Sequence, residues 1–173
     1  MNRPDAESIE PPLRLLFVCS GNTCRSPLAE VLSRRVAPEL GLPAVEVFSA
    51  GTLTRPGLPA SGGALRAAGR HGLTLEGHAS TVLSEELVDW ADWIFAMGPG
   101  HLHQLEMLGA GGKAVLLGVF AREEGSSGKE IDDTDLAVPD PFGGDDTVYE
   151  ETFQTLELYV ESAMKRLVRE VEG

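Results

Sequence analysis

Short apolar runs alternate with amphipathic segments along most of the chain. Four runs are short enough to be buried strands and are bounded by turn residues: residues 13–18, 45–48, 93–97 and 114–117. Between and after them lie segments with a helical spacing of apolar positions: residues 27–36, 60–71, 84–92, 102–108 and 149–171. Alternation of this kind predicts an α/β fold, in which a parallel sheet carries helices on both faces.

The last amphipathic segment has the most regular pattern. Its apolar residues recur at intervals of three and four positions, which predicts one long helix with a buried face: Tyr149, Phe153, Leu156, Val160, Ala163, Leu167 and Val171. Asp145 and Asp146 precede this helix, and the helix dipole favours acidic residues at that end. Ser84 is placed to cap the helix expected at residues 84–92.

Length and composition favour one domain. A chain of 173 residues ordinarily forms a single core. Residues 1–12, MNRPDAESIEPP, lack the apolar core of a signal peptide, so we expect a disordered extension there and one domain over residues 13–173. No apolar run approaches membrane-spanning length, and the two cysteines cannot form a disulfide framework. These features predict a cytoplasmic protein that does not act at a membrane.

Acidic residues outnumber basic residues by 27 to 14, which gives a net charge of −13. This balance argues against nucleic acid as a partner, because a polyanion would be repelled. Residues 13–35 are nevertheless locally basic, since they hold four arginines against one glutamate: Arg14, Arg25, Arg34, Arg35 and Glu30. The overall acidity is consistent with solubility alone, or with a preference for substrates that have basic flanking residues.

The motif VCSGNTCRSP joins the first apolar run to the first helical segment. Cys19 and Arg25 are separated by five residues, which are Ser20, Gly21, Asn22, Thr23 and Cys24. The amides of such a loop can curl inward into an anion nest, and the following helix adds the positive end of its dipole. Both effects predict a lowered pKa for the Cys19 thiol, while Arg25 can hold two phosphate oxygens in a fork. The motif therefore predicts attack of a thiolate on phosphorus.

A polar and acidic stretch over residues 121–138 interrupts the regular pattern. Long loops in compact domains tend to be functional or mobile, although this one can equally be a plain connection. It leads into Asp140, whose neighbours Pro139 and Pro141 restrict the backbone and can hold its carboxyl group in one place. Taken alone, an aspartate between prolines is typical of a turn.

The stretch from Phe17 to Glu30, FVCSGNTCRSPLAE, resembles the signature of the low-molecular-weight protein tyrosine phosphatases. Further matches follow in the order that the family has: Ser49-Ala50-Gly51, His78-Ala79-Ser80, and Asp140-Pro141-Phe142-Gly143-Gly144 followed by Tyr149. The resemblance covers residues 15–167. It implies a four-stranded parallel sheet of order 2-1-3-4, with Cys19 at the carboxyl end of the central first strand, where ligands bind in such sheets.

The resemblance also implies a mechanism and a set of residues for it. Cys19 would be the nucleophile that forms a phosphocysteine intermediate, Arg25 would hold the phosphate, and Asp140 would act first as acid and then as base. This chemistry requires no metal and no cofactor, and the partners would be phosphorylated proteins. Cys24 could form a disulfide with Cys19 on oxidation and so protect it.

Four residues are expected to support the loop. Ser26 could donate a hydrogen bond to the Cys19 thiolate and could also cap the helix that begins at residue 27. Asn22 tolerates the positive φ that a nest requires. In the family, the side chain of this asparagine is tied to a serine and a histidine that match Ser49 and His78.

Two positions bear on the substrate. Thr23 stands where phosphotyrosine enzymes of the family commonly have isoleucine or leucine, and Phe142 is followed by two glycines. This combination resembles the bacterial protein-arginine phosphatases. A threonine hydroxyl suits a guanidinium better than an apolar ring, whereas Phe142 can stack on either. We therefore expect a protein-arginine phosphatase, with a protein-tyrosine phosphatase as the alternative.

Two other classes are disfavoured. Arsenate reductases that couple to thioredoxin share the loop, but they need resolving cysteines on a mobile segment, and beyond Cys24 the chain has no cysteine. A catalytically dead phosphopeptide-binding module would not need Cys19, Arg25 and Asp140 together. Both alternatives are weaker than a cysteine-dependent phosphatase.

Overall fold

The computed structural model describes residues 11–42, 44–122 and 133–173. Most of the expected N-terminal extension lies outside these residues, as do residues 123–132 of the expected loop. In the part that is described, no helix combines the length and the apolar character needed to cross a membrane.

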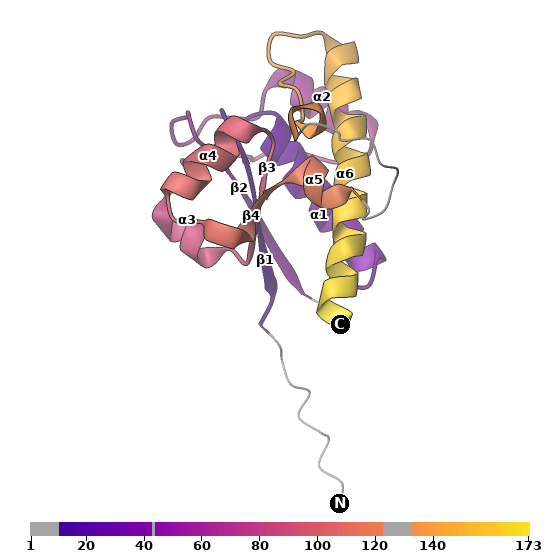
Figure 1. Ribbon diagram of the computed structural model, residues 1–173. Helices are drawn as coiled ribbons and strands as arrows, with labels where there is room; N and C mark the ends of the chain where they lie inside the picture. Colours follow the sequence, from indigo (N-terminus) through magenta and orange to yellow (C-terminus); the bar gives the residue numbers. More distant parts are fainter. Residues whose placement is uncertain (1–10, 43, 123–132) are drawn as a thin grey trace, which may run out of the picture.

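The predicted α/β architecture is confirmed (Figure 1). Four parallel strands form one sheet in the order β2-β1-β3-β4: β1 (Leu13–Cys19), β2 (Val45–Gly51), β3 (Trp93–Ala96) and β4 (Ala114–Leu116). β2 is three residues longer than predicted, because Ser49, Ala50 and Gly51 pair with the last three residues of β1. The ladder therefore continues as far as Cys19, so the backbone is held in place where the loop after β1 begins.

The helices agree with the predicted segments apart from their ends. They are α1 (Arg25–Glu39), α2 (Gly62–Arg70), α3 (Glu85–Trp90), α4 (Pro99–Met107) and α6 (Asp146–Glu172). The chain also forms α5 (Leu117–Ala121) and the short 3₁₀ helices η1 (Gly111–Lys113) and η2 (Asp133–Leu136). Ser84 and Asp145 are N-caps, since their side chains accept from the amides of Leu87 and Val148. The capping role expected of Ser26 is wrong, because α1 already begins at Arg25.

Alternation along the strands divides the core into two layers. Leu15 and Phe17 face the cluster formed with α1, α2, α5 and α6, whereas Leu16 and Val18 face α3 and α4. Figure 1 shows α3 and α4 on one side of the sheet and α1 and α6 on the other. Both faces of the central strand are thus covered, and only its carboxyl end remains for a ligand site.

The short elements α5, η1 and η2 were not predicted, and α5 and η2 contact each other. Elements of this length are too short for a helical periodicity to stand out. The packing of α5 on η2 is close, because a Cβ atom at Gly118 would overlap the carbonyl oxygen of Leu136. Beyond η2, the buried Val138 donates its amide to the carbonyl of Met97 at 2.8 Å. The end of the expected loop is therefore tied to the end of β3, directly before Asp140.

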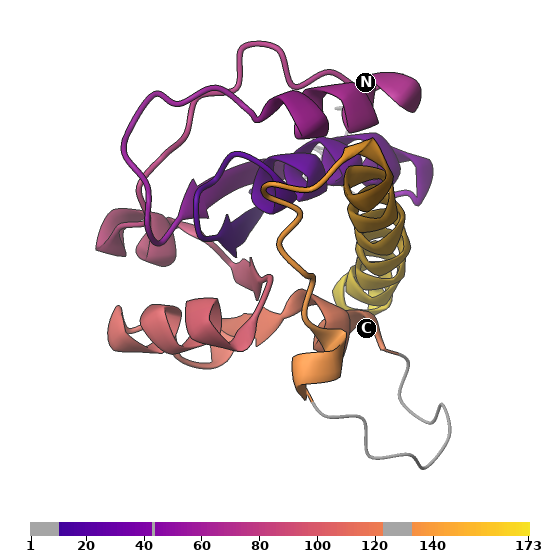
Figure 2. The same cartoon turned by 90° about the horizontal axis from the view of Figure 1, so that it is seen from above.

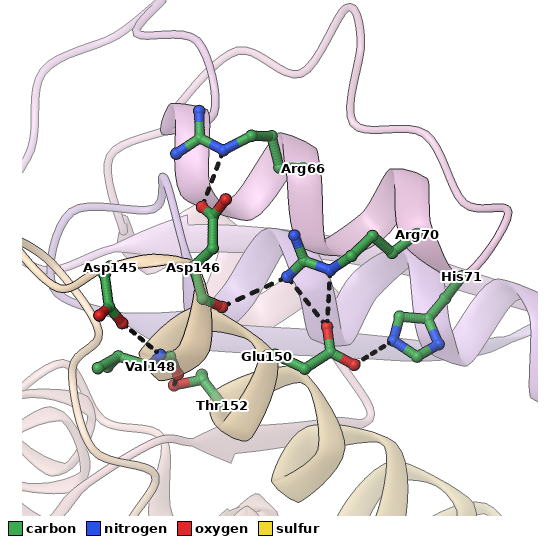
Figure 3. Close-up of polar contacts among 8 residues, drawn as sticks. All are labelled: Arg66, Arg70, His71, Asp145, Asp146, Val148, Glu150 and Thr152. Atoms are coloured by element: carbon green, nitrogen blue, oxygen red, sulfur yellow. Dashed lines mark hydrogen bonds and ion pairs between the residues drawn. The ribbon is translucent and has the colours of Figure 1, made fainter.

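Polar contacts join α2 to the beginning of α6 (Figure 3). Arg66 pairs with Asp146 at 2.9 Å, and Glu150 receives both Arg70 at 3.0 Å and His71 at 2.6 Å. The pair of Arg66 and Asp146 is exposed and contributes little to the free energy of unfolding, whereas the groups around Glu150 are partly buried. Their position orients the first turns of α6, which carry Tyr149 into the core behind the first β–α loop.

Gly63 is the residue that makes room for Tyr149. A Cβ atom at Gly63 would overlap the ring of Tyr149, whereas one at Gly69 on the same helix would have no neighbour within 4 Å. We expect Gly63→Ala to lower the free energy of unfolding by about 2 kcal/mol through overpacking, and Gly69→Ala to raise it by about 0.5 kcal/mol through helix propensity. Chemical denaturation of both variants measures this, and equal effects would contradict the assigned packing.

Candidate active site

The loop from Cys19 to Arg25 lies between the end of β1 and the start of α1, beside the topological switch of the sheet. Asn22 has a φ of 54°, the one positive φ among the described non-glycine residues, as a nest requires. In Figure 2, the segment that precedes α6 crosses over this end of the sheet. The loop and the segment that holds Asp140 therefore face each other.

Cys19 lies at the bottom of the loop and is only 2% exposed. Its Sγ atom is 2.8 Å from the hydroxyl oxygen of Ser26, which also accepts a hydrogen bond from the side-chain amide of Asn22 at 2.8 Å. Because the Asn22 amide occupies one lone pair of that oxygen, the Ser26 hydroxyl hydrogen is free to point at sulfur. The contact expected between Ser26 and Cys19 is present.

The pKa of the Cys19 thiol is raised, contrary to the prediction of a lowered value. Burial is the largest cause, because it takes the thiolate out of water. The hydroxyl and backbone amide of Ser26, the charge of Arg25 and the backbone amide of Asn22 all act in the opposite direction. The sequence reveals these stabilising groups but not the depth at which packing places the sulfur.

Asn22 is the centre of the network behind the loop. Its Nδ2 donates to Ser49 Oγ at 2.9 Å, and its Oδ1 accepts from the Thr81 amide at 2.9 Å. His78 Nε2 is 2.7 Å from the backbone oxygen of Asn22, so the expected contact with His78 involves the main chain and not the side chain. Thr81 was not predicted, because a backbone donor leaves no signal in residue type. Together these bonds hold Asn22 in its unusual conformation.

Arg25 and Asp140 come together from distant parts of the chain. Arg25 is 6% exposed, and its Nη1 donates to the carbonyl of Val138 at 3.0 Å. Its Nη2 lies 3.7 Å from Asp140 Oδ2, while Asp140 Oδ1 accepts from the Phe142 amide at 3.0 Å. The carbonyl group of Val138 thus holds the guanidinium of Arg25 in place. The half-exposed carboxylate of Asp140 stands over the loop, where it has access to a bound group.

A pocket of about 670 Å³ opens between the loop and Asp140. Its lining combines predicted site residues with a segment that the sequence did not single out: Cys19, Ser20, Gly21, Thr23, Cys24, Arg25, Asp140 and Phe142 with Leu53, Thr54, Arg55 and Leu58. Leu53 and Phe142 are 82% and 75% exposed at this pocket. Apolar side chains exposed to this degree beside a polar floor are suited to grip the carbon part of a substrate side chain.

The local basicity inferred for residues 13–35 is not concentrated at the pocket. Among its described lining residues, the cations are Arg25 and Arg55. The other three arginines of the segment are paired elsewhere: Arg14 with Glu46, Arg34 with Glu30, and Arg35 with Glu157. The positive charge available to a bound anion therefore comes mainly from the buried Arg25, with backbone amides beside it.

Cys24 has polar neighbours of its own. Its Sγ atom is 3.2 Å from Ser61 Oγ and 3.5 Å from the hydroxyl of Tyr149, and Ser61 also donates its amide to the carbonyl of Thr23 at 2.9 Å. Both cysteines are free thiols. Tyr149 therefore braces the back of the loop, and the protective disulfide expected of Cys24 stays a prediction.

His101 is a site residue that the sequence analysis did not select. It lies in the first turn of α4, is buried, and has Nε2 2.8 Å from the hydroxyl of Ser20. Burial, followed by the charge of Arg25, lowers the pKa of His101 to about 4, although the charge of Asp140 acts to raise it. A signal was available, because residues that follow neighbouring parallel strands gather at the same edge of the sheet. In the described part of the chain, no three His, Cys, Asp or Glu side chains are grouped to bind a metal ion.

Comparisons with known proteins agree with this geometry. Residues 14–173 match the family model described as low molecular weight phosphotyrosine protein phosphatase. The protein-arginine-phosphatase of Geobacillus stearothermophilus is 35% identical over 162 residues, which are 92% of this chain and 99% of that protein. The low molecular weight protein-tyrosine-phosphatase Etp of Escherichia coli K12 is 35% identical over 157 residues, 90% of this chain and 95% of that protein.

A solved structure is similar along the same length. The arginine phosphatase YwlE, in a Cys-to-Ser mutant with a phosphorylated active-site serine, is 33% identical to this chain. The match covers 92% of this chain and 96% of the YwlE chain, with a TM-score of 0.74. Family match, relatives and fold point the same way: the chain belongs to the low molecular weight phosphotyrosine protein phosphatase family, whose members are cysteine-dependent phosphatases.

Proposed function

We propose that this phosphatase removes phosphoryl groups from arginine side chains of proteins, with Cys19 as the nucleophile. The observation that carries the proposal is the hydroxyl-bearing Thr23 on the wall of the pocket, in a loop that also holds Cys19 and Arg25. The similarity to the protein-arginine-phosphatase of Geobacillus stearothermophilus supports it. The site joins an anion nest to a wall with hydrogen-bonding capacity, which a planar guanidinium can use.

In the first step, the Cys19 thiolate attacks phosphorus and an S–P bond forms as the N–P bond breaks. The bonding pair of the N–P bond goes to nitrogen, which takes a proton from the Asp140 carboxyl group. Arg25 and the loop amides hold the phosphoryl oxygens, so they neutralise the charge that spreads over them in the transition state. The products of this step are an unphosphorylated arginine side chain in the substrate protein and phosphocysteine.

In the second step, water attacks the phosphorus of the phosphocysteine. The Asp140 carboxylate, which gave up its proton in the first step, takes one from the attacking water. The S–P bond breaks and its electron pair returns to Cys19 as a thiolate, which the Ser26 hydroxyl 2.8 Å away stabilises. Inorganic phosphate leaves, and the enzyme is restored to its starting state.

Thr23→Ile tests the substrate directly. Isoleucine offers an apolar wall and leaves guanidinium donors unpaired, which costs on the order of 1 to 3 kcal/mol in a closed site. We expect kcat/KM for a phosphoarginine peptide to fall by roughly tenfold to a hundredfold, while kcat/KM for a phosphotyrosine peptide holds or rises. An equal fall with both peptides would contradict the proposed role of Thr23.

The second candidate is a protein-tyrosine phosphatase with the same chemistry. The observation in its favour is Phe142, which is 75% exposed at the pocket and can stack on a phenyl ring as readily as on a guanidinium. The protein-tyrosine-phosphatase Etp and the protein-arginine-phosphatase of Geobacillus stearothermophilus are both 35% identical to this chain. A higher kcat/KM of the wild-type enzyme for phosphotyrosine than for phosphoarginine peptides would favour this candidate and reject the arginine proposal.

A further inference from the structure

Ser20, on the wall of the pocket, forms a pair with His101, which does not itself line the pocket. Ser20 directly follows Cys19 and lines the same pocket as Thr23. Its hydroxyl oxygen is 2.8 Å from Nε2 of His101, although 81 positions separate the two residues in the chain. The Ser20 backbone is fixed as well, since its carbonyl accepts from the amide of Leu53 at 3.0 Å.

The pair has no competing polar partner among the residues that the structure describes. Nδ1 of His101 is buried and makes no hydrogen bond to any of them, so Ser20 is the polar group that the ring contacts. Burial and the nearby charge of Arg25 keep the ring neutral at physiological pH, with a pKa of about 4. A neutral His101 ring does not repel the cationic group of a substrate that enters the pocket beside Arg25.

The hydroxyl oxygen of Ser20 can accept a hydrogen bond in addition to its contact with His101. If His101 donates from Nε2, one lone pair of the Ser20 oxygen stays free; if His101 accepts, both lone pairs stay free. In either tautomer, the ring fixes the rotamer of Ser20 and an acceptor remains for a bound group. A guanidinium brings several N–H donors into the pocket, and Thr23 Oγ1 alone cannot pair with all of them.

We propose that Ser20, held in place by His101, is a specificity-determining residue whose hydroxyl oxygen accepts a hydrogen bond from the guanidinium of bound phosphoarginine. This inference rests on the proposed function. Ser20 contacts the substrate, whereas His101 is a positioning residue that acts through Ser20. An aryl phosphate has no donor at this place, so this hydrogen bond forms with bound phosphoarginine and not with a bound aryl phosphate.

The test compares Ser20→Ala and His101→Leu, singly and together, on a phosphoarginine peptide and on p-nitrophenyl phosphate. Each single variant is expected to lower kcat/KM for the peptide by about tenfold and to lower kcat/KM for the aryl phosphate clearly less, so that the ratio of the two values falls. In the Ser20→Ala background, His101→Leu should add nothing, because its effect passes through Ser20. His101→Gln, whose amide nitrogen can take the place of Nε2, should restore activity on the peptide.

His103, exposed two positions further along α4, provides the matched control. His103→Leu should behave as the wild-type enzyme on both substrates. Equal losses with both substrates would show that the pair only supports the loop and would overturn the inference. Ser20→Ala decides the question by itself if His101→Leu does not fold.

The proposed function and this inference fail in different ways. A wild-type enzyme without activity on phosphoarginine peptides would reject both proposals. If the wild-type enzyme hydrolyses these peptides and Ser20→Ala leaves kcat/KM for them unchanged, only the role of Ser20 is rejected.

Discussion

Cys19→Ser is expected to lower turnover by on the order of ten-thousandfold or more, because a serine hydroxyl is far less acidic and far less nucleophilic than a thiol and cannot replace it. Binding of inorganic phosphate should remain measurable, since the loop amides and Arg25 are unchanged. Release of phosphate from an aryl phosphate measures the first effect, and calorimetric titration with phosphate measures the second.

Binding and turnover together make this experiment decisive. A variant that binds phosphate yet does not turn over places Cys19 in the chemical step and not merely in the fold. Appreciable turnover by Cys19→Ser would remove Cys19 from the mechanism. The nucleophile would then have to be sought elsewhere on the pocket wall, where Cys24 is the second thiol.

Asp140→Asn is expected to slow hydrolysis by roughly a hundredfold to ten-thousandfold, the range typical of a lost general acid. The loss should depend on the leaving group. A guanidine nitrogen leaves poorly without a proton, so hydrolysis of phosphoarginine should suffer most, whereas p-nitrophenolate leaves readily and should suffer least. Comparison of kcat for the two substrates measures the difference.

Asp135, an exposed residue in η2, supplies the matched control for Asp140. Asp135→Asn makes the same chemical change in the segment before the site and should leave kcat unchanged. If Asp140→Asn were as active as the wild-type enzyme and Asp135→Asn were slowed, the acid would have to be assigned to η2.

Arg25 connects the Cys19 loop and Asp140 to the rest of the fold. Its guanidinium is buried, donates to the Val138 carbonyl and lies 3.7 Å from Asp140. Val138 is in turn bonded to Met97 at the end of β3. The position of Asp140 over Cys19 is therefore maintained by a chain of contacts from the central sheet, and the half-exposed carboxylate itself remains accessible to substrate and water.

The sequence by itself determined the α/β architecture and the loop from Cys19 to Arg25. Strands and the long α6 were predictable because burial on a sheet or a helix face imposes a period on consecutive residues. The loop was predictable because a nest is made by neighbouring amides, so its parts lie within one turn of the chain. Asp140 was found only through the resemblance, since an aspartate between prolines is typical of an ordinary turn.

Only the tertiary structure decided what reaches the loop from elsewhere. His101 meets Ser20 and Thr81 meets Asn22 across 81 and 59 positions, and neither pairing has a local sequence signal. The raised pKa of Cys19 was likewise not predictable, because it depends on burial. Hydrogen-bonding capacity belongs to a residue type and can be read from the sequence, whereas partners and desolvation are properties of packing, which depends on the whole chain.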